Sequence, residues 1–353
     1  MDLDQFVVAV ELLGHPDLRG RPVVVGDAGD LTRRGVVAGA SYEARQFGIH
    51  SAMPLRRAAA RCPDLVCLPL DVERYQAASV EVMAALRSLP GAVVEVAGWD
   101  EAFLDIQAAD PEHFARVLQA TVRARTGLSC SVGIGDNKLQ AKTATELAKP
   151  GGVRRLSTVS WPARIWPRPP DELPGIGSKT ARRLAEHDIR TVGELAAADG
   201  ALLASVFGPV AGPRLRSLAR GQDRSPVSPV PRPARSHGQA TIFQHDVEDP
   251  TAVHAAVQEL AAQVASGVAA QGRNTVRLVV TVRFAPFDTH AHGTSLALDA
   301  GPGAFERAAE VALGRFVLDR PVRLVGVRAE LDRGEVELAR RTEPRDLGRL
   351  SRT

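Results

Sequence analysis

The sequence has little cysteine, little lysine and no long apolar run. Only three cysteines occur in 353 residues, and "CPDLVC" (62–67) has no second Cys or His pair to complete a zinc site. This content argues against a disulfide framework and favours structural thiols in a reducing cytosol. No apolar run approaches the roughly 20 residues that cross a bilayer, and the opening "MDLDQF" lacks the basic and apolar pattern of a secretion signal. We therefore expect a cytoplasmic protein that does not span a membrane.

Lysine is scarce, and its few positions are clustered. Only four of the 44 Lys and Arg residues are lysines; Lys138, Lys142 and Lys149 lie in "NKLQAKTATELAK", and Lys179 follows "PGIG". A lysine ammonium is a compact point charge that suits phosphate, so the clustering predicts phosphate contacts. Chance clustering on a solvated helix face explains the pattern equally well at this stage.

Two adjacent acids, Asp100 and Glu101, interrupt two strand-like runs, 93–97 and 102–106. Neighbouring side chains of one regular strand point to opposite faces, so the acids can share a site only where the strand turns. Gly98-Trp99 predicts a two-residue hairpin connection, after which both carboxylates crowd one edge of the sheet. Anions that close repel unless a cation lies between them. A solvated turn is the simpler alternative, because acids beside glycine are common in turns.

The length predicts several domains, and the segments have different patterns. Strands alternate with amphipathic helices up to about residue 156, which predicts an α+β layer; the expected strands are 23–26, 35–40 and 128–135, and the expected helices begin at Ser41 and cover 71–89 and 111–127. Residues 161–221 are helical, and 223–238 form a Pro-rich basic linker. A strand–helix–strand–strand–helix–strand order follows, with helices at 250–270 and 303–317, and predicts a small separate α/β domain.

The helical segment contains "ELPGIGSKTARRLAEHDIRTVGEL" (172–195), which is typical of a helix-hairpin-helix. Gly175 and Gly177 allow a tight turn between two amphipathic helices, and the N–H groups at the next helix start would face outward. Such groups bind a phosphate, with Lys179 adding charge. A plain helical hairpin with glycine caps is the alternative.

With these motifs in order, the chain resembles a Y-family translesion DNA polymerase of the DinB, or DNA polymerase IV, class over nearly its whole length. The matching segments are "MDLDQFVVAVE" (1–11), "ASYEARQFGIHSAMPL" (40–55), "WDEAFLD" (99–105), "CSVGIGDNKLQAKTATELAKPGG" (130–152) and "LPGIGSKTARRL". The resemblance implies a right-hand polymerase with an α/β little finger. The expected domains are a palm (1–12 and 70–156), fingers (13–69), a thumb (157–221), a linker (222–236), a little finger (237–335) and a flexible tail (336–353).

The resemblance also implies a site. Asp2, Asp100 and Glu101 would be the catalytic acids that hold two Mg²⁺ ions, with the backbone carbonyl of Leu3 completing one metal site. Asp4 and Asp105 are not metal ligands in the family pattern and are left out. Tyr42, Arg45 and Lys149 would contact the triphosphate.

In the family an aromatic ring five residues after the first metal-binding Asp excludes the ribose 2′-hydroxyl by steric clash and so acts as a steric gate. That place holds Val7, with Phe6 just before it and expected to point to the opposite face of the strand. The alternative is that Val7 is a core residue and that Phe6 or a backbone shift supplies the gate.

The implied partners are primer-template DNA, deoxynucleoside triphosphates and, if Val7 leaves the gate open, ribonucleoside triphosphates. The DNA contacts expected from the motifs and the strand pattern are Gly175, Gly177, Lys179, Arg232, Arg235, Arg277 and Arg283, with Arg224, Arg323 and Arg328 as further candidates. The expected little finger has more acids than arginines, so affinity should be modest and salt-dependent. We expect a monomer, and the tail lacks the Gln-plus-hydrophobic peptide that would dock on a sliding clamp.

Three departures from the family pattern stand out. Met1 directly precedes Asp2, which predicts a short first palm strand or a start further upstream; Trp99 replaces a small polar residue; and Val7 replaces the aromatic gate. None removes a metal ligand. The alternatives are a non-catalytic DNA-binding relative that serves as a repair scaffold and a helix-hairpin-helix nuclease. The nuclease alternative is disfavoured because residues 157–221 contain no acidic cluster suited to activating water. The sequence also lacks a second acidic cluster of the kind that a proofreading exonuclease needs, so we expect no proofreading.

Overall fold

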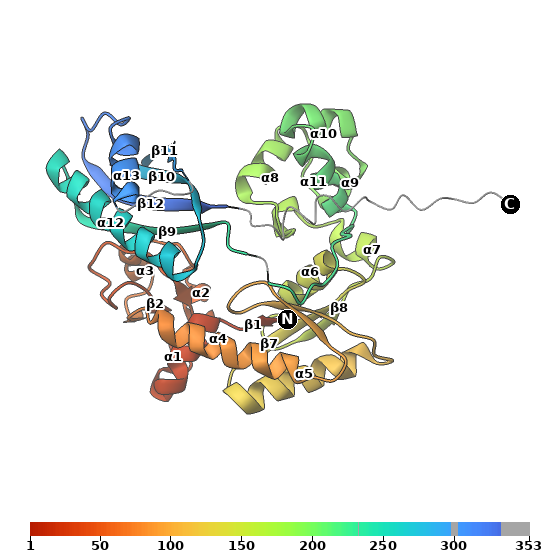
Figure 1. Cartoon of the computed structure of the whole chain (residues 1–353). Coiled ribbons are helices and arrows are strands. Elements are labelled where there is room, and N and C mark those ends of the chain that lie inside the picture. Colours follow the sequence, from red (N-terminus) through yellow and green to blue (C-terminus); the bar gives the residue numbers. More distant parts are fainter. Residues whose placement is uncertain (232, 298–302, 333–353) are drawn as a thin grey trace. The chain divides into compact units, whose positions relative to one another are not determined.

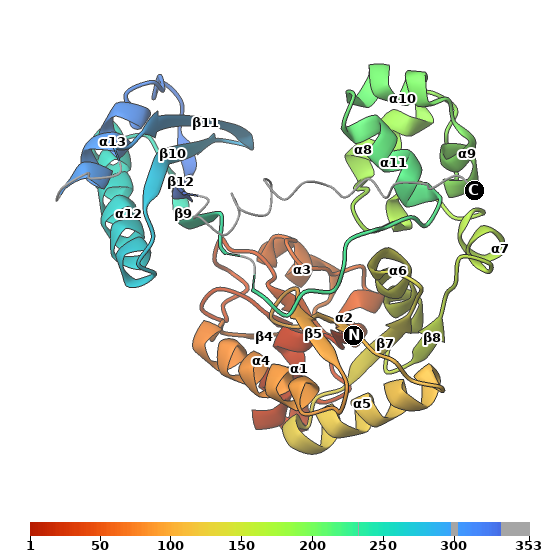
Figure 2. The same ribbon diagram turned by 45° about the vertical axis from the view of Figure 1, so that its right-hand side comes forward.

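The computed structural model describes residues 1–231, 233–297 and 303–332. Contacts divide the chain into two compact units: the first contains residues 1–31 and 36–231, and the second contains 32–35 and the chain from 232 onward. Both units combine helices with sheets (Figures 1 and 2), so the expected α+β class is confirmed. Within the described ranges no helix is both long enough and apolar enough to span a bilayer.

The first unit is built on a three-stranded sheet in the order β1-β7-β8, extended on its other side by the hairpin β5-β6. These strands are β1 (Asp2–Leu3), β5 (Val93–Val96), β6 (Ala102–Asp105), β7 (Cys130–Ile134) and β8 (Val153–Arg155). As the sequence indicated, β1 is short. Asp2 lies opposite Ser131 of β7 on one side and opposite Glu101 on the other. The first acid therefore lies between the two halves of the sheet.

Helices cover both faces of this sheet. Helices α4 (Val72–Arg87) and α5 (Pro111–Thr126) pack beside each other, and α5 and α6 (Lys138–Ala148) lie on opposite sides of β7 (Figures 1 and 2). The close approach of α6 depends on Gly133, because a Cβ added there would lie 2.0 Å from the carbonyl oxygen of Ala141. A side chain at this point would push α6, with its lysines, away from the sheet.

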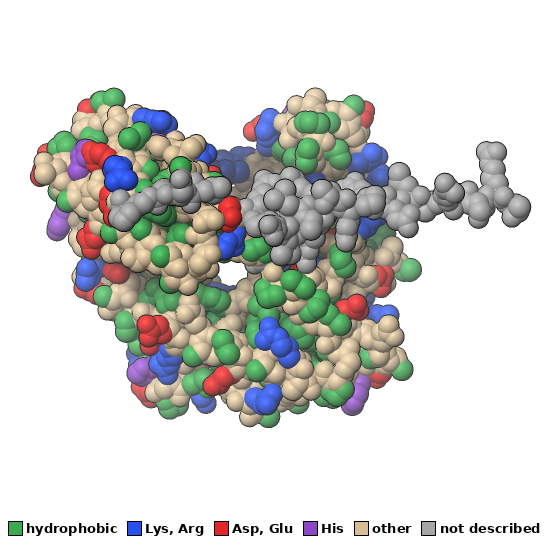
Figure 3. All heavy atoms as spheres, in the orientation of Figure 1, with side chains coloured by type: hydrophobic (Ala, Val, Ile, Leu, Met, Phe, Trp, Pro, Cys, Tyr) green, Lys and Arg blue, Asp and Glu red, His purple; other side chains and the backbone are tan. Residues whose placement is uncertain are grey.

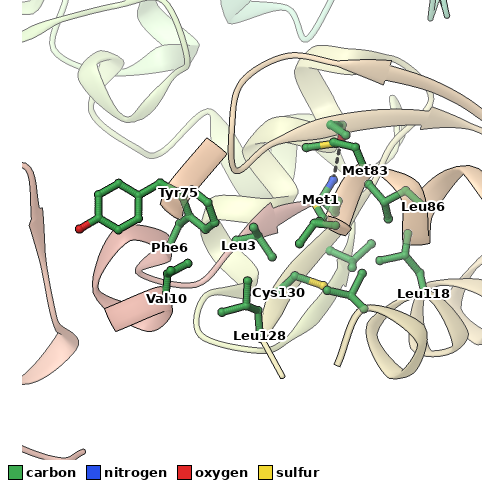
Figure 4. Packing of buried hydrophobic residues seen from close by; sticks show 14 of the residues in the cluster. Met1, Leu3, Phe6, Val10, Tyr75, Met83, Leu86, Leu118, Leu128 and Cys130 are labelled. Carbon is green, nitrogen blue, oxygen red and sulfur yellow. Dashed lines mark hydrogen bonds between the residues drawn. The ribbon is translucent and has the colours of Figure 1, made fainter. Parts of the chain in front are cut away.

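The segment after β1 differs from the expectation. Phe6 and Val7, which were expected to lie on opposite faces of a strand, belong to helix α1 (Phe6–Gly14). The chain turns at Gln5, whose φ of 44° lies in the left-handed region and ends the strand. Figure 4 shows Met1, Leu3 and Phe6 directed into the core, with the Phe6 and Tyr75 rings edge to face at 6.5 Å. Burial of this apolar face outweighs the β-propensity of the valines.

A smaller sheet in the order β3-β2-β4 forms the part expected to be the fingers. Its elements are η1 (Pro16–Leu18), β2 (Val23–Val25), β3 (Gly39–Ala40), α2 (Tyr42–Gln46), α3 (Leu55–Arg61) and β4 (Val66–Leu68). The expected start of a helix at Ser41 is confirmed, because the Ser41 hydroxyl accepts a hydrogen bond of 3.1 Å from the Ala44 N–H.

The helical segment begins with a short turn. It contains α7 (Trp161–Ile165), η2 (Pro170–Glu172), α8 (Ser178–Ala185), α9 (Val192–Ala197), α10 (Gly200–Phe207) and α11 (Ala211–Ala219). "PGIG" is therefore preceded by a single 3₁₀ turn, not by the amphipathic helix that the sequence suggested. Gly175 has a φ of 93°, which suits glycine, and Ile176 is buried and anchors the turn.

The second unit has the expected strand–helix order. It contains β9 (Ser236–Val247), α12 (Pro250–Ala270), β10 (Thr275–Phe284), β11 (Asp288–Ser295), α13 (Ala304–Leu313) and β12 (Val322–Leu331), with the sheet in the order β11-β10-β12-β9. The helix expected at 250–270 is found with these bounds, whereas α13 is shorter than the expected 303–317. Residues 222–231, which precede the second unit and belong to the expected linker, form no helix or strand. They nevertheless contact the first unit, because the Ser228 N–H donates to Glu95 at 2.8 Å.

Candidate active site

The turn that carries the two adjacent acids is longer than expected. Strands β5 and β6 pair from Val93 with Asp105 to Val96 with Ala102, so five residues, 97–101, form the connection, not two. The Ala97 and Gly98 N–H groups both donate to the carbonyl oxygen of Glu101, at 3.0 and 3.1 Å. This wider loop still ends the alternation of side chains at the acids.

The acids lie together at the end of this hairpin. A Cβ at Gly98 would lie 3.5 Å from Asp100 Oδ1 and 3.3 Å from Glu101 Cγ, so both side chains flank the same glycine. Strand β1 runs alongside: the Leu3 N–H donates to the Asp100 carbonyl at 2.8 Å, and Asp2 faces Glu101 across the bridge. Backbone pairing thus brings Asp2, Asp100 and Glu101 to one edge, although Asp2 and Asp100 are far apart in sequence.

Each clustered lysine has a carboxylate partner. Lys138 contacts Glu95 at 2.5 Å, Lys142 contacts Glu101, and Lys149 contacts Asp2 at 2.9 Å. All three come from α6 or the residue that follows it. Chance clustering on a solvated helix face does not describe this arrangement, because the lysines are counter-ions of the acids. Phosphate contact stays a prediction.

Burial makes the carboxylates reluctant to ionise. It raises the pKa of Asp2, and the hydrogen bond from Lys149 offsets only part of this effect. Burial also raises the pKa of Asp100, to which the neighbouring charge of Glu101 contributes. Although burial pulls the pKa of Lys149 down, its bonds to Asp2 and Glu146 outweigh that effect and raise it. The site therefore holds an excess of negative charge that cations stabilise.

No preformed metal cluster exists in the part of the chain that the structure describes: no three His, Cys, Asp or Glu side chains are arranged to hold an ion. The physical reason is the pairing of Asp2 and Glu101 with lysines, which directs those carboxylates to the ammonium groups. The donor set nevertheless fits a hard divalent cation, because three carboxylates meet at adjacent backbone positions. A metal ion would take the place of Lys142 and Lys149.

The three residues expected at the triphosphate lie near these acids in different ways. On α2, the Arg45 guanidinium lies 5.0 Å from the centre of the Tyr42 ring, and its Nε donates to the Ala40 carbonyl at 3.1 Å. The Tyr42 hydroxyl donates to Asp4 at 3.1 Å, and Lys149 contacts Asp2. Tyr42 and Lys149 therefore each contact an acid in β1 or directly after it.

Phe6 and Val7, the two residues considered for the steric gate, have different surroundings. Phe6 is 4% exposed and packs on Tyr75, so its ring belongs to the core and not to the nucleotide site. The expectation that Phe6 and Val7 occupy opposite faces of a strand is wrong, because both lie on α1. Val7 is half-buried, and a Cβ added to Gly39 would lie 3.0 Å from its Cβ. A glycine in β3 thus makes room for Val7.

Sequence reasoning missed Asp4 and Lys142. Asp4 was set aside because it is not a metal ligand in the family pattern, yet it is buried and bonded to Tyr42, Ser129, Ser131 and Gly151. Lys142 was noticed as a rare lysine but was not assigned to an acid. The four-residue spacing between Lys138 and Lys142 could have indicated a common face toward the sheet.

The expected DNA contacts are exposed, but several arginines are already paired. Gly175, Gly177 and Lys179 are exposed at the start of α8. Arg235 and Arg277 are exposed and Arg283 is half-buried, whereas Arg232 lies outside the described residues. Arg277 lies 3.8 Å from Glu330, and Arg283 donates to the Thr289 hydroxyl. Acidic and basic side chains are intermingled on the face of this unit in Figure 3.

Comparison with known proteins decides the family. Models of the impB/mucB/samB family match residues 1–146, and those of its C-terminal domain match 234–331; the thumb-domain model of DNA polymerase iota matches 171–223. DNA polymerase IV 2 of Mycobacterium tuberculosis is 46% identical over 336 residues, covering 94% of this chain and 96% of the relative. The chain belongs to the DNA polymerase IV family. Its enzyme class is DNA-directed DNA polymerase.

Other comparisons agree. DNA polymerase IV of Methanoculleus marisnigri is 37% identical over 340 residues, covering 95% of this chain and 94% of the relative. A solved Y-family polymerase chimera of Dbh and Dpo4 superimposes with a TM-score of 0.83 at 25% identity, covering 93% of this chain and 97% of that one. An insertion ternary complex of Dbh polymerase gives a TM-score of 0.64 at 25% identity, covering 94% and 97%. The right-hand polymerase fold expected from the motifs is thus confirmed.

Proposed function

We propose that this polymerase adds nucleotides to a primer 3′ end by two-metal nucleotidyl transfer, with Asp2, Asp100 and Glu101 as the catalytic acids. The observation that carries the proposal is that all three reach one edge of the sheet and that two of them are held by lysine ammonium groups. These residues, with the Leu3 carbonyl, would hold two Mg²⁺ ions. When bound, such ions screen the triphosphate and lower the pKa of the primer hydroxyl.

The protein's own residues bind and orient the substrate. Arg45 would pair with phosphate oxygens through its planar guanidinium, and Lys149, once released from Asp2, would supply a point charge. Tyr42 would offer its hydroxyl. These groups lie on α2 and directly after α6, so the triphosphate would lie between the two helices, beside β1.

Primer-template DNA would be gripped mainly through phosphates. The N–H groups at the exposed glycine turn, with Lys179, would contact one strand of the duplex. Arg235, Arg277 and Arg283 would add contacts from the second unit. Because Arg277 already has an acidic neighbour, we expect modest affinity that falls steeply with salt. Docking on a sliding clamp through the tail is not expected; the tail lies outside the described residues.

We also infer that the enzyme accepts ribonucleotides more readily than an aromatic-gated relative. Val7 lacks the reach of a ring, and Phe6 is buried elsewhere, so no aromatic side chain from this turn can block a 2′-hydroxyl. The enzyme has no second acidic cluster suited to proofreading in its sequence, so an inserted ribonucleotide would stay in the product.

Primer extension tests the proposal. The unmodified protein with Mg²⁺ should extend a primer, and Asp100→Ala or Glu101→Ala should reduce the rate by about 100-fold or more, as is typical when a group that stabilises the transition state is lost. A thermal melt of each variant controls for folding. A folded, unmodified protein that extends no primer would sink the catalytic proposal and favour a DNA-binding scaffold.

A further inference from the structure

Asp4 is a buried carboxylate with an unusual set of partners. It is 5% exposed, and its two oxygens accept four hydrogen bonds from neutral donors. Oδ1 accepts from the Tyr42 hydroxyl at 3.1 Å and from the Ser131 hydroxyl at 2.7 Å. Oδ2 accepts from the Ser129 hydroxyl at 2.7 Å and from the Gly151 N–H at 3.0 Å. Burying a carboxylate costs free energy, which these bonds offset.

The four donors come from three separate parts of the first unit. Tyr42 begins helix α2, Ser131 lies in β7 and Ser129 just before it, and Gly151 lies in the turn two residues after Lys149. Asp4 therefore joins the two segments that supply the proposed triphosphate contacts. Packing alone would be served by an apolar residue of similar size, which makes a purely structural reason for a buried carboxylate weak.

Gln5 adds a second hold on the same tyrosine. Its side-chain oxygen accepts a hydrogen bond of 2.7 Å from the Tyr42 N–H, while Asp4 accepts from the Tyr42 hydroxyl. Two consecutive residues thus fix both ends of Tyr42. They stand two and three residues after Asp2, so the position of the tyrosine is coupled to that of the first catalytic acid.

We propose that Asp4 is a positioning residue for the incoming nucleotide, holding Tyr42 and the Lys149–Gly151 turn at the spacing that a triphosphate needs. The inference rests on the proposed function, because Tyr42 and Lys149 are assigned to the triphosphate there. The hydroxyl proton of Tyr42 cannot serve Asp4 and a phosphate oxygen at once. Asp4 therefore keeps the ring in place before the nucleotide binds. When the nucleotide arrives, the Tyr42 hydroxyl donates its hydrogen bond to a phosphate oxygen and no longer to Asp4.

The test measures nucleotide binding without catalysis. The full-length protein is bound to a primer-template whose primer ends in a dideoxynucleotide, and the next correct deoxynucleoside triphosphate is titrated with Mg²⁺ present. Asp4→Ala should raise the nucleotide Kd about 10-fold, the effect of losing a hydrogen bond to a charged group. Asp4→Asn, which keeps one oxygen and is safer for folding, should give a smaller rise of about 3-fold.

Glu11 offers a matched control. It is also 5% exposed and also accepts a hydrogen bond from a tyrosine hydroxyl, that of Tyr75, at 2.6 Å. Its other oxygen accepts from Arg74 at 3.0 Å, and neither partner is a proposed triphosphate contact. Glu11→Gln should lower the melting temperature as Asp4→Asn does, while leaving the nucleotide Kd unchanged. A general loss of packing would move both variants alike.

A double-mutant cycle separates positioning from support of the fold. If Asp4 acts through the Tyr42 hydroxyl, Asp4→Asn should weaken binding much less in a Tyr42→Phe background than in the unmodified protein. Additive effects, or an unchanged Kd in folded Asp4→Asn, would overturn the inference while leaving the triphosphate assignment standing. If Tyr42→Phe and Lys149→Ala themselves leave the Kd unchanged, the triphosphate assignment fails, and the role of Asp4 fails with it.

Discussion

At the scale of single residues, burial of the proposed catalytic acids Asp2 and Asp100 lowers the free energy of unfolding when their carboxylates are ionised. Asp100 is half-buried beside Glu101, and burial raises its pKa above the ordinary value. The folded state therefore binds the proton of Asp100 more tightly than the unfolded state does. Its stabilising share is full below the unfolded pKa and is lost as pH rises through the folded pKa. Near neutral pH the ionised group is a net burden on the metal-free protein.

Asp100→Asn should therefore stabilise the metal-free enzyme while abolishing primer extension. We expect the melting temperature at pH 7 to rise by about 1–3 °C, because solvent screening limits the gain at a half-buried site. The difference between the variant and the unmodified protein should shrink as pH falls toward the unfolded pKa. Differential scanning calorimetry across pH checks this, and a lower melting temperature at pH 7 would contradict it.

Val7 is the residue where a single change should alter substrate choice. Val7→Phe should restore exclusion of ribonucleotides, because steric overlap of this kind costs roughly 1–3 kcal/mol, equivalent to about 5- to 150-fold in discrimination. Addition of deoxynucleotides should be spared. Single-nucleotide extension with each sugar measures the ratio, and a melt shows whether the ring fits beside Gly39. Equal rejection of ribonucleotides by both proteins would refute the open gate.

At the scale of elements, helix α6 organises the site. Gly133 lets the helix approach β7, which brings Lys138, Lys142 and the following Lys149 to acidic partners. The Lys138–Glu95 pair is the most buried and lies over the Phe103 ring at 5.4 Å. The other two pairs are more exposed, which suits groups that a metal ion would displace.

Removing Lys142 should tighten metal binding. In Lys142→Met a competing positive charge beside Glu101 is lost, so the Mg²⁺ midpoint should fall by about 3- to 10-fold at moderate ionic strength. Lys142→Arg keeps the charge and should leave the midpoint near that of the unmodified protein. Calorimetric titration with terminated primer-template and nucleotide gives the midpoints. A higher Mg²⁺ midpoint in Lys142→Met would show that the lysine assists metal binding and does not compete with it.

Elements with a clear period were predictable from the sequence, and those decided by neighbours were not. Helix α12 was predicted with its bounds because its apolar positions recur at helical spacing between Asp249, which caps it, and Gly272. Phe6 and Val7 were expected to lie on opposite faces of a strand, but they belong to helix α1. What makes them helical is the turn at Gln5 and the burial of Phe6 against Tyr75, a residue far along the chain.

The site shows the same division. Asp100 and Glu101 could be found from the sequence because two acids in an apolar hairpin are conspicuous. Their pairing with Lys142 and Lys149 depends on how α6 lies on the sheet, which no local pattern encodes. The partners of Asp4 are still harder to predict, since they are drawn from α2, β7 and the turn after α6.

At the scale of the whole molecule, the chain divides into a unit with the acids and a unit in which many arginines up to residue 332 are paired with acids. Arg323 makes two hydrogen bonds of 3.0 Å to Asp246, and Arg328 contacts Glu330 at 3.1 Å. Hydrogen bonds from Arg323 and from Arg34 together lower the pKa of Asp246 to about 2. Such arginines are poor phosphate ligands until their acidic partners are displaced.

A chain ending at residue 231 should keep the first unit folded and bind primer-template DNA more weakly. Because fewer cations then contact phosphates, the slope of log affinity against log salt should also become shallower. Fluorescence anisotropy over a range of salt concentrations measures both quantities, with a thermal melt to confirm folding. Unchanged affinity and slope would show that the second unit does not grip DNA.

The pairing of β1 with β7 also sets the order in which the protein can form. Asp2 pairs with Ser131, and the core that receives Met1, Leu3 and Phe6 is lined by Leu118, Leu128 and Cys130 (Figure 4). On the ribosome, the first strand has to wait for that partner. At 5–20 residues per second the delay is roughly 6–26 s. Through this interval the apolar N-terminal segment stays exposed, so a nascent chain of this enzyme should be a substrate for chaperones that bind apolar segments early.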